Sequence, residues 1–192
     1  MQFEIVSATL FLQIALLVAV VCATVLIVAF SVFNGISPMP SSRKALAAVL
    51  ELIKEADTGG SIVDLGSGWG TLCFAVAAAF PDREVCGYEN SPVPYIYCLL
   101  INALVRRRNL RFVRRNFYAV PLHEAGLVLC YLYSGAMVRL KSKFENELRA
   151  GTVVVSNTFA VPLWKPRGVV ELRDMYRSKT YLYVTGNAAR NL

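Results

Sequence analysis

The chain has 192 residues with a formal net charge of +7, and 56% of its residues are hydrophobic. This length allows one ordinary domain and a short additional segment, so no separate substrate domain is expected. A single histidine and the absence of any C-x-x-C pair argue against a zinc site, so no metal is expected. The five cysteines lie in apolar stretches and are interpreted as reduced core residues, which suits a cytoplasmic domain.

The N-terminal segment from Ile5 to Phe33 contains no charged residue, proline or glycine over 29 residues. It exceeds the ~20 residues that cross a hydrocarbon core as a helix. A cleaved signal peptide would have a basic start and an apolar stretch of about 7–15 residues. Here Glu4 is the only charged residue before the apolar run, and the run is about twice as long. A buried core helix is the other alternative, but a domain of this size could hardly cover so many apolar side chains. We therefore predict a transmembrane anchor over residues 1–34, with the lipid bilayer as a partner.

Positive charge begins beyond the anchor with Arg43, Lys44 and Lys54, whereas the other flank carries only Glu4. The positive-inside rule predicts a single-pass protein with its N-terminus outside and its main domain in the cytoplasm. The part after the anchor keeps all 20 basic residues and 12 of the 13 acidic ones. A basic domain beside a bilayer is attracted to anionic headgroups. Tethering makes nucleic acid the weaker interpretation, so no nucleic-acid partner is expected.

Residues 35–60 are expected to form a linker and a leading amphipathic helix. The stretch 34–42 reads NGISPMPSS, a connector rich in proline, serine and glycine. Residues 43–56 then place apolar side chains at helical spacing.

From Ser61 onward, short β-branched runs alternate with helical patterns. The expected strands cover residues 61–65, 84–89, 110–114, 127–132 and 152–156, and the expected helices cover 69–80, 92–106 and 136–149. Period-two alternation over 169–176 and 179–185 predicts a terminal hairpin. The order implies an α/β fold, a Rossmann-like doubly wound sheet of seven strands closed by an antiparallel hairpin over residues 61–192.

A glycine-rich stretch at 63–70 reads VDLGSGWG and lies at an expected strand-to-helix turn. Gly66, Gly68 and Gly70 let the backbone approach a ligand and adopt positive φ, and the next helix offers free N–H groups. The second strand ends in Glu89, whose carboxylate is placed to accept hydrogen bonds from ribose hydroxyls where the strand order reverses. A tight turn without a ligand is the alternative.

Asp64 distinguishes between two cofactors. A dinucleotide fingerprint, G-x-G-x-x-G, has its third glycine one residue later and needs no preceding acid. The Asp64 carboxylate suits the ammonium group of a methionine moiety and would repel a pyrophosphate. We therefore predict S-adenosyl-L-methionine as cofactor, bound by Asp64, Gly66, Ser67, Gly68, Gly70 and Glu89.

These residues resemble those of class I S-adenosylmethionine-dependent methyltransferases. More narrowly, residues 38–183 resemble the family of the ATP synthase c-subunit and adenine nucleotide translocase lysine N-methyltransferases and its prokaryotic relatives. The further matching stretches are PSS at 40–42, GYENSP at 87–92, YLY at 131–133, KFENEL at 143–148 and PLWKP at 162–166. The resemblance implies methyl transfer to a lysine ε-amine of a membrane protein, and it adds Asn90 to the cofactor residues.

Two departures from the family pattern concern the adenine and the substrate. After the third expected strand, where the family usually has an aspartate near the adenine amino group, this chain has Asn116 and Phe117. The Asn116 carbonyl can still accept that hydrogen bond, with Phe117 against the ring. The fourth strand ends in YLY rather than the Asn-Pro-Pro-Tyr of amide and adenine N-methyltransferases, which argues against a nucleobase amine as substrate.

Methyl transfer to lysine needs alignment, exclusion of water and a neutral amine, all of which an aromatic cleft can supply. The predicted catalytic cleft residues are Tyr131, Tyr133 and Trp164, joined by Asn157 and Phe159, with simple packing as the alternative for each. No acid/base pair is evident, which fits a positioning mechanism.

Several features allow more than one interpretation. The six arginines within 106–115 could be a solvated helix end and a protected edge strand, they could contact lipid headgroups, or they could bind an acidic protein. His123 is interpreted as a surface residue, and the charges of 141–147 as an exposed helix face. The acceptor could instead be a lipid or quinone headgroup, or the chain could be a non-catalytic scaffold, although Asp64 and Glu89 speak against the scaffold.

Overall fold

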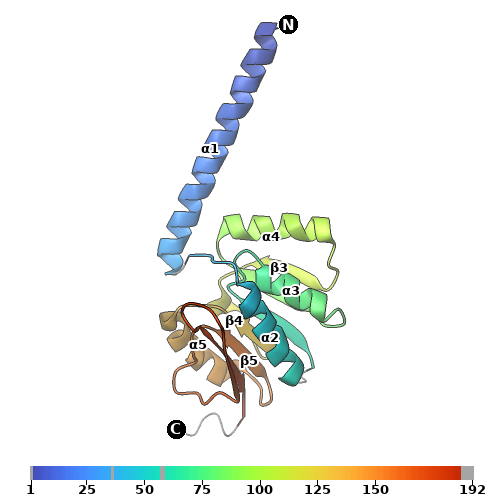
Figure 1. Cartoon of the computed structure of the whole chain (residues 1–192), viewed down its shortest axis with the longest axis vertical. Helices are drawn as coiled ribbons and strands as arrows, with labels where there is room; N and C mark the ends of the chain where they lie inside the picture. Colours follow the sequence, from blue (N-terminus) through green and yellow to red (C-terminus); the bar gives the residue numbers. More distant parts are fainter. Residues whose placement is uncertain (1, 36, 57–58, 187–192) are drawn as a thin grey trace. The chain divides into compact units, whose positions relative to one another are not determined.

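The computed structural model describes residues 2–35, 37–56 and 59–186, and the chain divides into two compact units, Met1–Ser37 and Pro38–Leu192 (Figure 1). The first unit is the helix α1 (Gln2–Asn34). Its segment Thr9–Asn34 has 26 residues and includes an 18-residue stretch with a mean hydropathy of 3.0, in which no residue is buried. At 1.5 Å per residue the segment is ~39 Å long, more than a hydrocarbon core of ~30 Å.

Two hydroxyl groups within α1 are satisfied by the helix itself. The hydroxyls of Thr24 and Ser31 donate to main-chain carbonyls four residues earlier, at 2.9 and 2.7 Å. These bonds satisfy both donors without water, as an apolar environment requires. By length and composition α1 can therefore cross a membrane.

The second unit is built on a seven-stranded sheet in the order β3-β2-β1-β4-β5-β7-β6. Strands β1 to β5 run parallel, β7 pairs antiparallel with β5, and β6 pairs antiparallel with β7. The predicted Rossmann-like sheet with a terminal antiparallel hairpin is confirmed. The strands are β1 (Ser61–Leu65), β2 (Val85–Glu89), β3 (Leu110–Arg114), β4 (Ala125–Cys130), β5 (Val153–Asn157), β6 (Gly168–Glu171) and β7 (Lys179–Val184).

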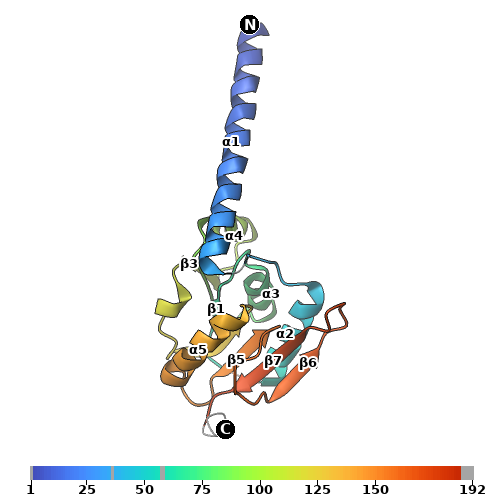
Figure 2. The same cartoon turned by 90° about the vertical axis from the view of Figure 1, so that its left-hand side faces the viewer.

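Helices cover both faces of the sheet (Figures 1 and 2). Helices α2, α3 and α4 pack on one face in a core that includes Ile62 of β1, whereas α5 packs on the other face in a core that includes Val63. Adjacent residues of one strand are thus buried on opposite faces, which explains the near-continuous apolar runs of the central strands. The helices are α2 (Arg43–Ala56), α3 (Thr71–Ala79), α4 (Pro92–Val105) and α5 (Ser134–Glu147), with a 3₁₀ turn η1 (Phe117–Ala119).

Helix α2 belongs to the same compact unit as the sheet. Its apolar face, which includes Val49, Leu52 and Ile53, is buried in the core shared with β5 and β7. The predicted segment 35–60 therefore contains an element of the main domain as well as a connector.

Most element ends lie within two residues of the prediction, and the differences at the start of α3 and at the end of β6 have local causes. Helix α3 begins at Thr71 rather than Trp69, because its N-cap Gly70 adopts a left-handed φ of 72°. Strand β6 ends at Glu171 rather than at residue 176. Beyond it the chain turns, and the Asp174 carboxylate accepts a hydrogen bond from the Ser178 N–H at 2.9 Å.

Candidate active site

The strand order reverses between β1 and β4. Open α/β sheets bind ligands outside the carboxyl ends of their strands at such a point. Leu65, the last residue of β1, pairs with Tyr88 on one side and Cys130 on the other. The glycine loop (residues 66–70) follows β1 and is joined to β2, because the N–H groups of Gly66 and Ser67 both donate to the Tyr88 carbonyl at 2.9 Å. The predicted cofactor residues therefore surround one edge of the sheet.

Glu89 holds the glycine loop in position. It is buried, and its two carboxylate oxygens accept from the N–H groups of Gly68 and Ser91, each at 2.7 Å. A carboxylate offers about four lone-pair sites, so each oxygen can accept one further donor. Glu89 thus faces the loop with capacity left for two hydroxyls, and the ribose contact stays a prediction.

Asp64 is a buried carboxylate with little local compensation. It is 3% exposed, and the Cys73 thiol, which donates to its Oδ2 at 3.1 Å, is its one hydrogen-bond partner among the described residues. Burial raises the pKa of Asp64 to about 7; the Cys73 bond opposes this rise and the nearby Glu89 carboxylate adds to it. Burial and the charge of Asp64 raise the pKa of the Cys73 thiol well above its usual value, so the thiol keeps its proton. A cationic ligand would stabilise this carboxylate.

The three loop glycines have positive φ values, but they have different neighbours. A Cβ would lie 2.8 Å from a side-chain atom of Leu132 at Gly66 and of Cys98 at Gly70. These two glycines are therefore required by packing inside the protein. At Gly68 the nearest atom would be 3.8 Å away. Space beside the loop is therefore open at Gly68, and the close approach of all three glycines to a ligand stays a prediction.

The remaining predicted cofactor residues lie around this loop. The Ser67 hydroxyl is buried and has no hydrogen-bond partner among the described residues. Phe117 lies beside the loop, since its ring would be 3.6 Å from a Cβ at Gly66. Asn116 is exposed, and its side-chain carbonyl caps η1 by accepting from the Tyr118 N–H at 3.0 Å, which leaves one lone pair.

A buried carboxylate without a cation and a buried hydroxyl without a partner are both unusual in a folded protein. Asp64 and Ser67 supply these two groups on either side of the turn that follows β1. Together with Gly68 and Glu89, they fit a cationic ligand that carries ribose hydroxyls. S-adenosylmethionine is such a ligand.

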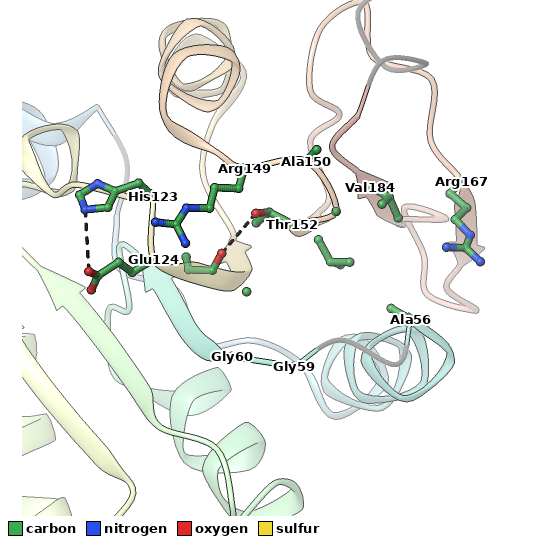
Figure 3. Close-up of a pocket in the computed structure, with 14 residues that line it drawn as sticks. Ala56, Gly59, Gly60, His123, Glu124, Arg149, Ala150, Thr152, Arg167 and Val184 are labelled. Atoms are coloured by element: carbon green, nitrogen blue, oxygen red, sulfur yellow. Dashed lines mark hydrogen bonds and ion pairs between the residues drawn. The ribbon is translucent and has the colours of Figure 1, made fainter.

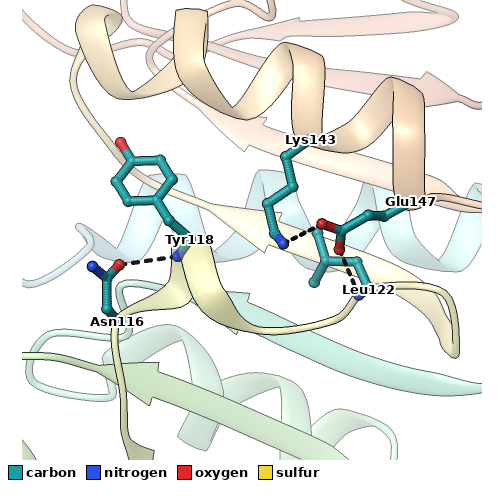
Figure 4. A network of polar contacts seen from close by, with 5 residues as sticks. All are labelled: Asn116, Tyr118, Leu122, Lys143 and Glu147. Carbon is teal, nitrogen blue, oxygen red and sulfur yellow. Dashed lines mark hydrogen bonds and ion pairs between the residues drawn. The ribbon is translucent and has the colours of Figure 1, made fainter.

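Helix α5 holds the connection that carries Asn116 (Figure 4). The Glu147 carboxylate accepts from the Leu122 N–H at 3.0 Å and from the Lys143 ammonium at 2.6 Å. The Lys143 side chain is only 10% exposed. The interpretation of this stretch as an ordinary exposed helix face is therefore wrong, because its charges bind α5 to the segment between β3 and β4. The sequence spacing indicated the i,i+4 pair of Lys143 and Glu147, but it could not indicate that the Leu122 N–H also donates to Glu147.

Trp164 lies in the core rather than on an open surface. It is 7% exposed, its indole N–H donates to Glu145 at 3.1 Å, and its ring packs 5.8 Å from that of Tyr183 and 6.1 Å from that of Phe144. These contacts join the PLWKP stretch to the KFENEL stretch. They are contacts of packing, so Trp164 is not included in the proposed cleft.

The other cleft candidates lie at neighbouring strand ends. Cys130, the last residue of β4, pairs with Ser156 of β5. Tyr131 directly follows β4, and Asn157 is the last residue of the adjacent strand β5. Tyr131 and Tyr133 are half-buried, and so is Phe159, beyond the end of β5. Asn157 is buried, and its side-chain oxygen accepts from the Thr180 hydroxyl at 3.2 Å.

The segment after β5 has a strained backbone that sequence reasoning missed. Thr158 and Leu163 adopt φ values of 70° and 64°, a left-handed region that is costly for a β-branched or bulky residue. The Thr158 N–H donates to the Lys179 carbonyl at 2.8 Å, and the Val161 N–H donates to the Tyr183 hydroxyl at 3.0 Å. Such strain clusters at ligand-binding segments. No periodicity in the sequence signals positive φ at a residue other than glycine.

A hollow of about 500 Å³ lies at the opposite, amino-terminal edge of the sheet (Figure 3). None of the predicted cofactor residues lines it, and its His123 and Glu124 form a loose, exposed pair at 4.0 Å. Open α/β sheets bind ligands outside the carboxyl ends of their strands. We therefore assign the site to the carboxyl edge and not to this hollow.

Residues 64–168 match the family model of the ANTKMT methyltransferase domain. The chain belongs to this family. It is 31% identical over 152 residues to a protein-lysine N-methyltransferase of Saccharolobus islandicus, covering 77% of this chain and 92% of that protein. It is also 30% identical over 138 residues to the adenine nucleotide translocase lysine N-methyltransferase of Mus musculus. That match covers 68% of this chain and 56% of the mouse enzyme, so the matched part of this chain corresponds to little more than half of the mouse enzyme.

Solved structures share the fold. An RNA methyltransferase of Salinibacter ruber in complex with S-adenosyl-L-homocysteine gives a TM-score of 0.65 at 22% identity, covering 76% of this chain and 93% of that one. A precorrin-6y C5,15-methyltransferase of Geobacter metallireducens gives a TM-score of 0.53 at 13% identity, covering 75% and 90%. The chain is a methyltransferase that depends on S-adenosylmethionine, so the predicted enzyme class and cofactor are confirmed.

Proposed function

We propose that this methyltransferase modifies a lysine ε-amine of a membrane protein while α1 holds it in the bilayer. The observation that carries the proposal is the match to a protein-lysine N-methyltransferase over 92% of that relative's length. The apolar helix Thr9–Asn34 supports a membrane location. The positive-inside rule supports a cytoplasmic catalytic unit, because Arg43, Lys44 and Lys54 follow the anchor.

The residues around the glycine loop would hold the cofactor. S-adenosylmethionine, when bound, supplies an electrophilic methyl group on a sulfonium. The Asp64 carboxylate would bind the cationic methionine end, and the free lone pairs of Glu89 would accept from the ribose hydroxyls. The Ser67 hydroxyl would gain the partner that it lacks. Phe117 would pack against the adenine, and the Asn116 carbonyl would accept from the adenine amino group.

The acceptor amine must be neutral to attack a methyl group. Burial between aromatic rings lowers a lysine pKa by desolvation, and this is the role that we assign to Tyr131, Tyr133 and Phe159. The rings also exclude water and align the amine with the methyl group. The side-chain oxygen of Asn157, held by Thr180, would orient the amine by accepting a hydrogen bond from one of its N–H groups. No general base is required, because the amine loses its proton before transfer.

Labelling of native membranes tests the proposal. Full-length enzyme in detergent is incubated with solubilised membranes and methyl-labelled S-adenosylmethionine, and the products are separated into protein and organic phases. We expect label in protein, as methyl-lysine in mass spectra, and at least about ten-fold less with the Asp64→Asn variant when the cofactor is not saturating. Label in the organic phase would instead identify a lipid or quinone acceptor. Absence of labelling together with absence of S-adenosylhomocysteine binding would indicate a scaffold.

A matched pair of variants tests the aromatic cleft separately. Tyr133→Phe keeps the ring and should keep most of the activity, whereas Tyr133→Leu removes it and should lower activity at least about ten-fold. Cofactor affinity should be the same in both variants. Equal activities would remove Tyr133 from the proposed cleft.

A further inference from the structure

The outward face of α4 is apolar where a soluble domain would carry charges. None of its 14 residues is charged. The spacing of the exposed side chains places them on one side of the helix. These side chains are between 42% and 77% exposed and belong to Ile96, Tyr97, Leu99, Leu100 and Leu104. The polar Asn102 faces the protein instead, where its amide donates to the Leu110 carbonyl at 2.9 Å.

The inner face of α4 is fixed to the domain. Cys98 is fully buried in the core that also contains Leu110 and Phe112 of β3. In Figure 1 α4 lies at the outside of the second unit, with α3 and β3 on its inner side. Fourteen residues make a helix of only ~21 Å, too short to cross a hydrocarbon core. The helix therefore cannot be a second membrane span, and its outer face needs a different cover.

The arginines of residues 106–115 divide into two groups in the structure. Arg106, Arg107 and Arg108 are exposed and directly follow the last turn of α4. On β3, Phe112 points into the core beneath α4, so the neighbouring Arg111 points to the opposite face of the sheet. Arg106–Arg108 directly adjoin the C-terminal end of the apolar face and place three positive charges at one end of an apolar stripe.

We propose that the apolar face of α4 and Arg106–Arg108 form a bilayer-docking surface for an anionic leaflet. The helix lies in the plane of the interface, with its aliphatic side chains among the acyl chains and its guanidinium groups at the headgroups. Charge decides against a second copy of the chain as the cover. Two copies packed through α4 would add the like charges of two arginine groups to one interface, whereas an anionic leaflet complements them. The inference rests on the proposed function in one respect, that α1 brings the unit to a bilayer.

Docking of α4 would bring the cofactor loop to the membrane surface. Tyr97 contacts Trp69 of the glycine loop edge-to-face, with ring centroids 5.3 Å apart. The Trp69 indole N–H in turn donates to the Pro38 carbonyl at 2.7 Å. The four-residue step from Asn34, the last residue of α1, to Pro38 can extend at most about 14 Å. Tyrosine and tryptophan are also the residues enriched at membrane interfaces. The acceptor lysine is then expected close to the headgroups.

Three label positions in the full-length chain test the surface. Cys22 in α1 is exposed, whereas Cys73, Cys86, Cys98 and Cys130 are buried. The chain is labelled with an environment-sensitive fluorophore at native Cys22. Two variants in a Cys22→Ser background are labelled through Leu100→Cys and through Val138→Cys. Val138 on α5 is the matched control, since it is 57% exposed and Leu100 is 62% exposed.

Each protein is reconstituted into phosphatidylcholine vesicles with or without phosphatidylserine, and quenching by nitroxide-labelled lipid is measured. We expect strong quenching at position 22 in both lipids. Quenching at position 100 should exceed that at position 138 at least about two-fold with phosphatidylserine. The excess should fall when Arg107→Gln and Arg108→Gln are added or phosphatidylserine is left out.

Three results would overturn the inference. Equal quenching at positions 100 and 138, with position 22 quenched, would reject docking and leave the anchor intact. No quenching at position 22 would reject the anchor as well. A signal at position 100 that follows the protein-to-lipid ratio and ignores phosphatidylserine would show that a second copy covers the face.

Discussion

Replacement of Asp64 by asparagine is expected to stabilise the protein and at the same time to weaken cofactor binding. The carboxylate is buried, and its pKa rises from 3.8 to about 7. A shift of this size corresponds to at most about 4 kcal/mol of unfavourable free energy for holding the charge in the folded state. Asparagine has nearly the same shape, can still accept from the Cys73 thiol, and carries no charge. The variant removes this cost and with it the charge available to a cationic ligand.

The pH dependence has a definite sign. The folded state holds the Asp64 proton more tightly than the unfolded chain, so the contribution to stability is full below pH 3.8 and is lost as pH rises through about 7. Between pH 5 and 8 the wild type should therefore lose roughly 2–3 kcal/mol relative to Asp64→Asn. Above pH 8 the difference should level off.

Urea unfolding followed by tryptophan fluorescence measures this difference. The chain has two tryptophans, and both lie in the second unit, so the signal from full-length protein in detergent reports that unit and not α1. Asp82→Asn is the matched control, because Asp82 is exposed and its variant should follow the wild type at every pH. Calorimetry should show at least about ten-fold weaker S-adenosylmethionine binding by Asp64→Asn. A stability difference that does not change with pH would refute the buried, partly protonated carboxylate.

Three further predictions concern the same site. Cofactor binding should lower the pKa of Asp64 and release about half a proton at pH 7, measured by calorimetry as a heat that depends on the buffer. The Asp64→Asn variant should lack this proton release, and the same buffer dependence in that variant would contradict the prediction. Glu147→Ala leaves the buried Leu122 N–H without its acceptor and should lower the free energy of unfolding by about 1–3 kcal/mol. Asn146 is exposed, so Asn146→Ala should change the free energy of unfolding little in the same urea titration. Gly66→Ala forces a Cβ within 2.8 Å of a Leu132 side-chain atom and should cost about 1–3 kcal/mol. Gly68→Ala should lower the cofactor affinity more than the free energy of unfolding. If Gly68→Ala lowered mainly the stability and Gly66→Ala mainly the affinity, the roles assigned to these two glycines would be wrong.

Local patterns determined much of the architecture. Apolar periodicity alone predicted α2, β1 and β3 at the residues where they occur. The buried stripe of a helix, the buried run of a central strand such as β1 and the alternating burial of the edge strand β3 each leave a pattern in nearby residues of the sequence. The length of the uncharged N-terminal run predicted α1 for the same reason. The glycine loop and the acid at the end of β2 were also predictable, since a strand-to-helix turn places both at one sheet edge.

Only the tertiary structure decided how the side chains of the site behave. The pKa of Asp64 depends on burial beneath α3 and on the Cys73 thiol. The burial of Trp164 and the attachment of Glu147 to Leu122 likewise join segments that sequence spacing does not relate. The outer face of α4 was hidden from sequence for a different reason, because an apolar helix reads as buried until its neighbours are known. Periodicity records which residues avoid water, whereas pKa, strain and exposure depend on which distant atoms fill the space around them.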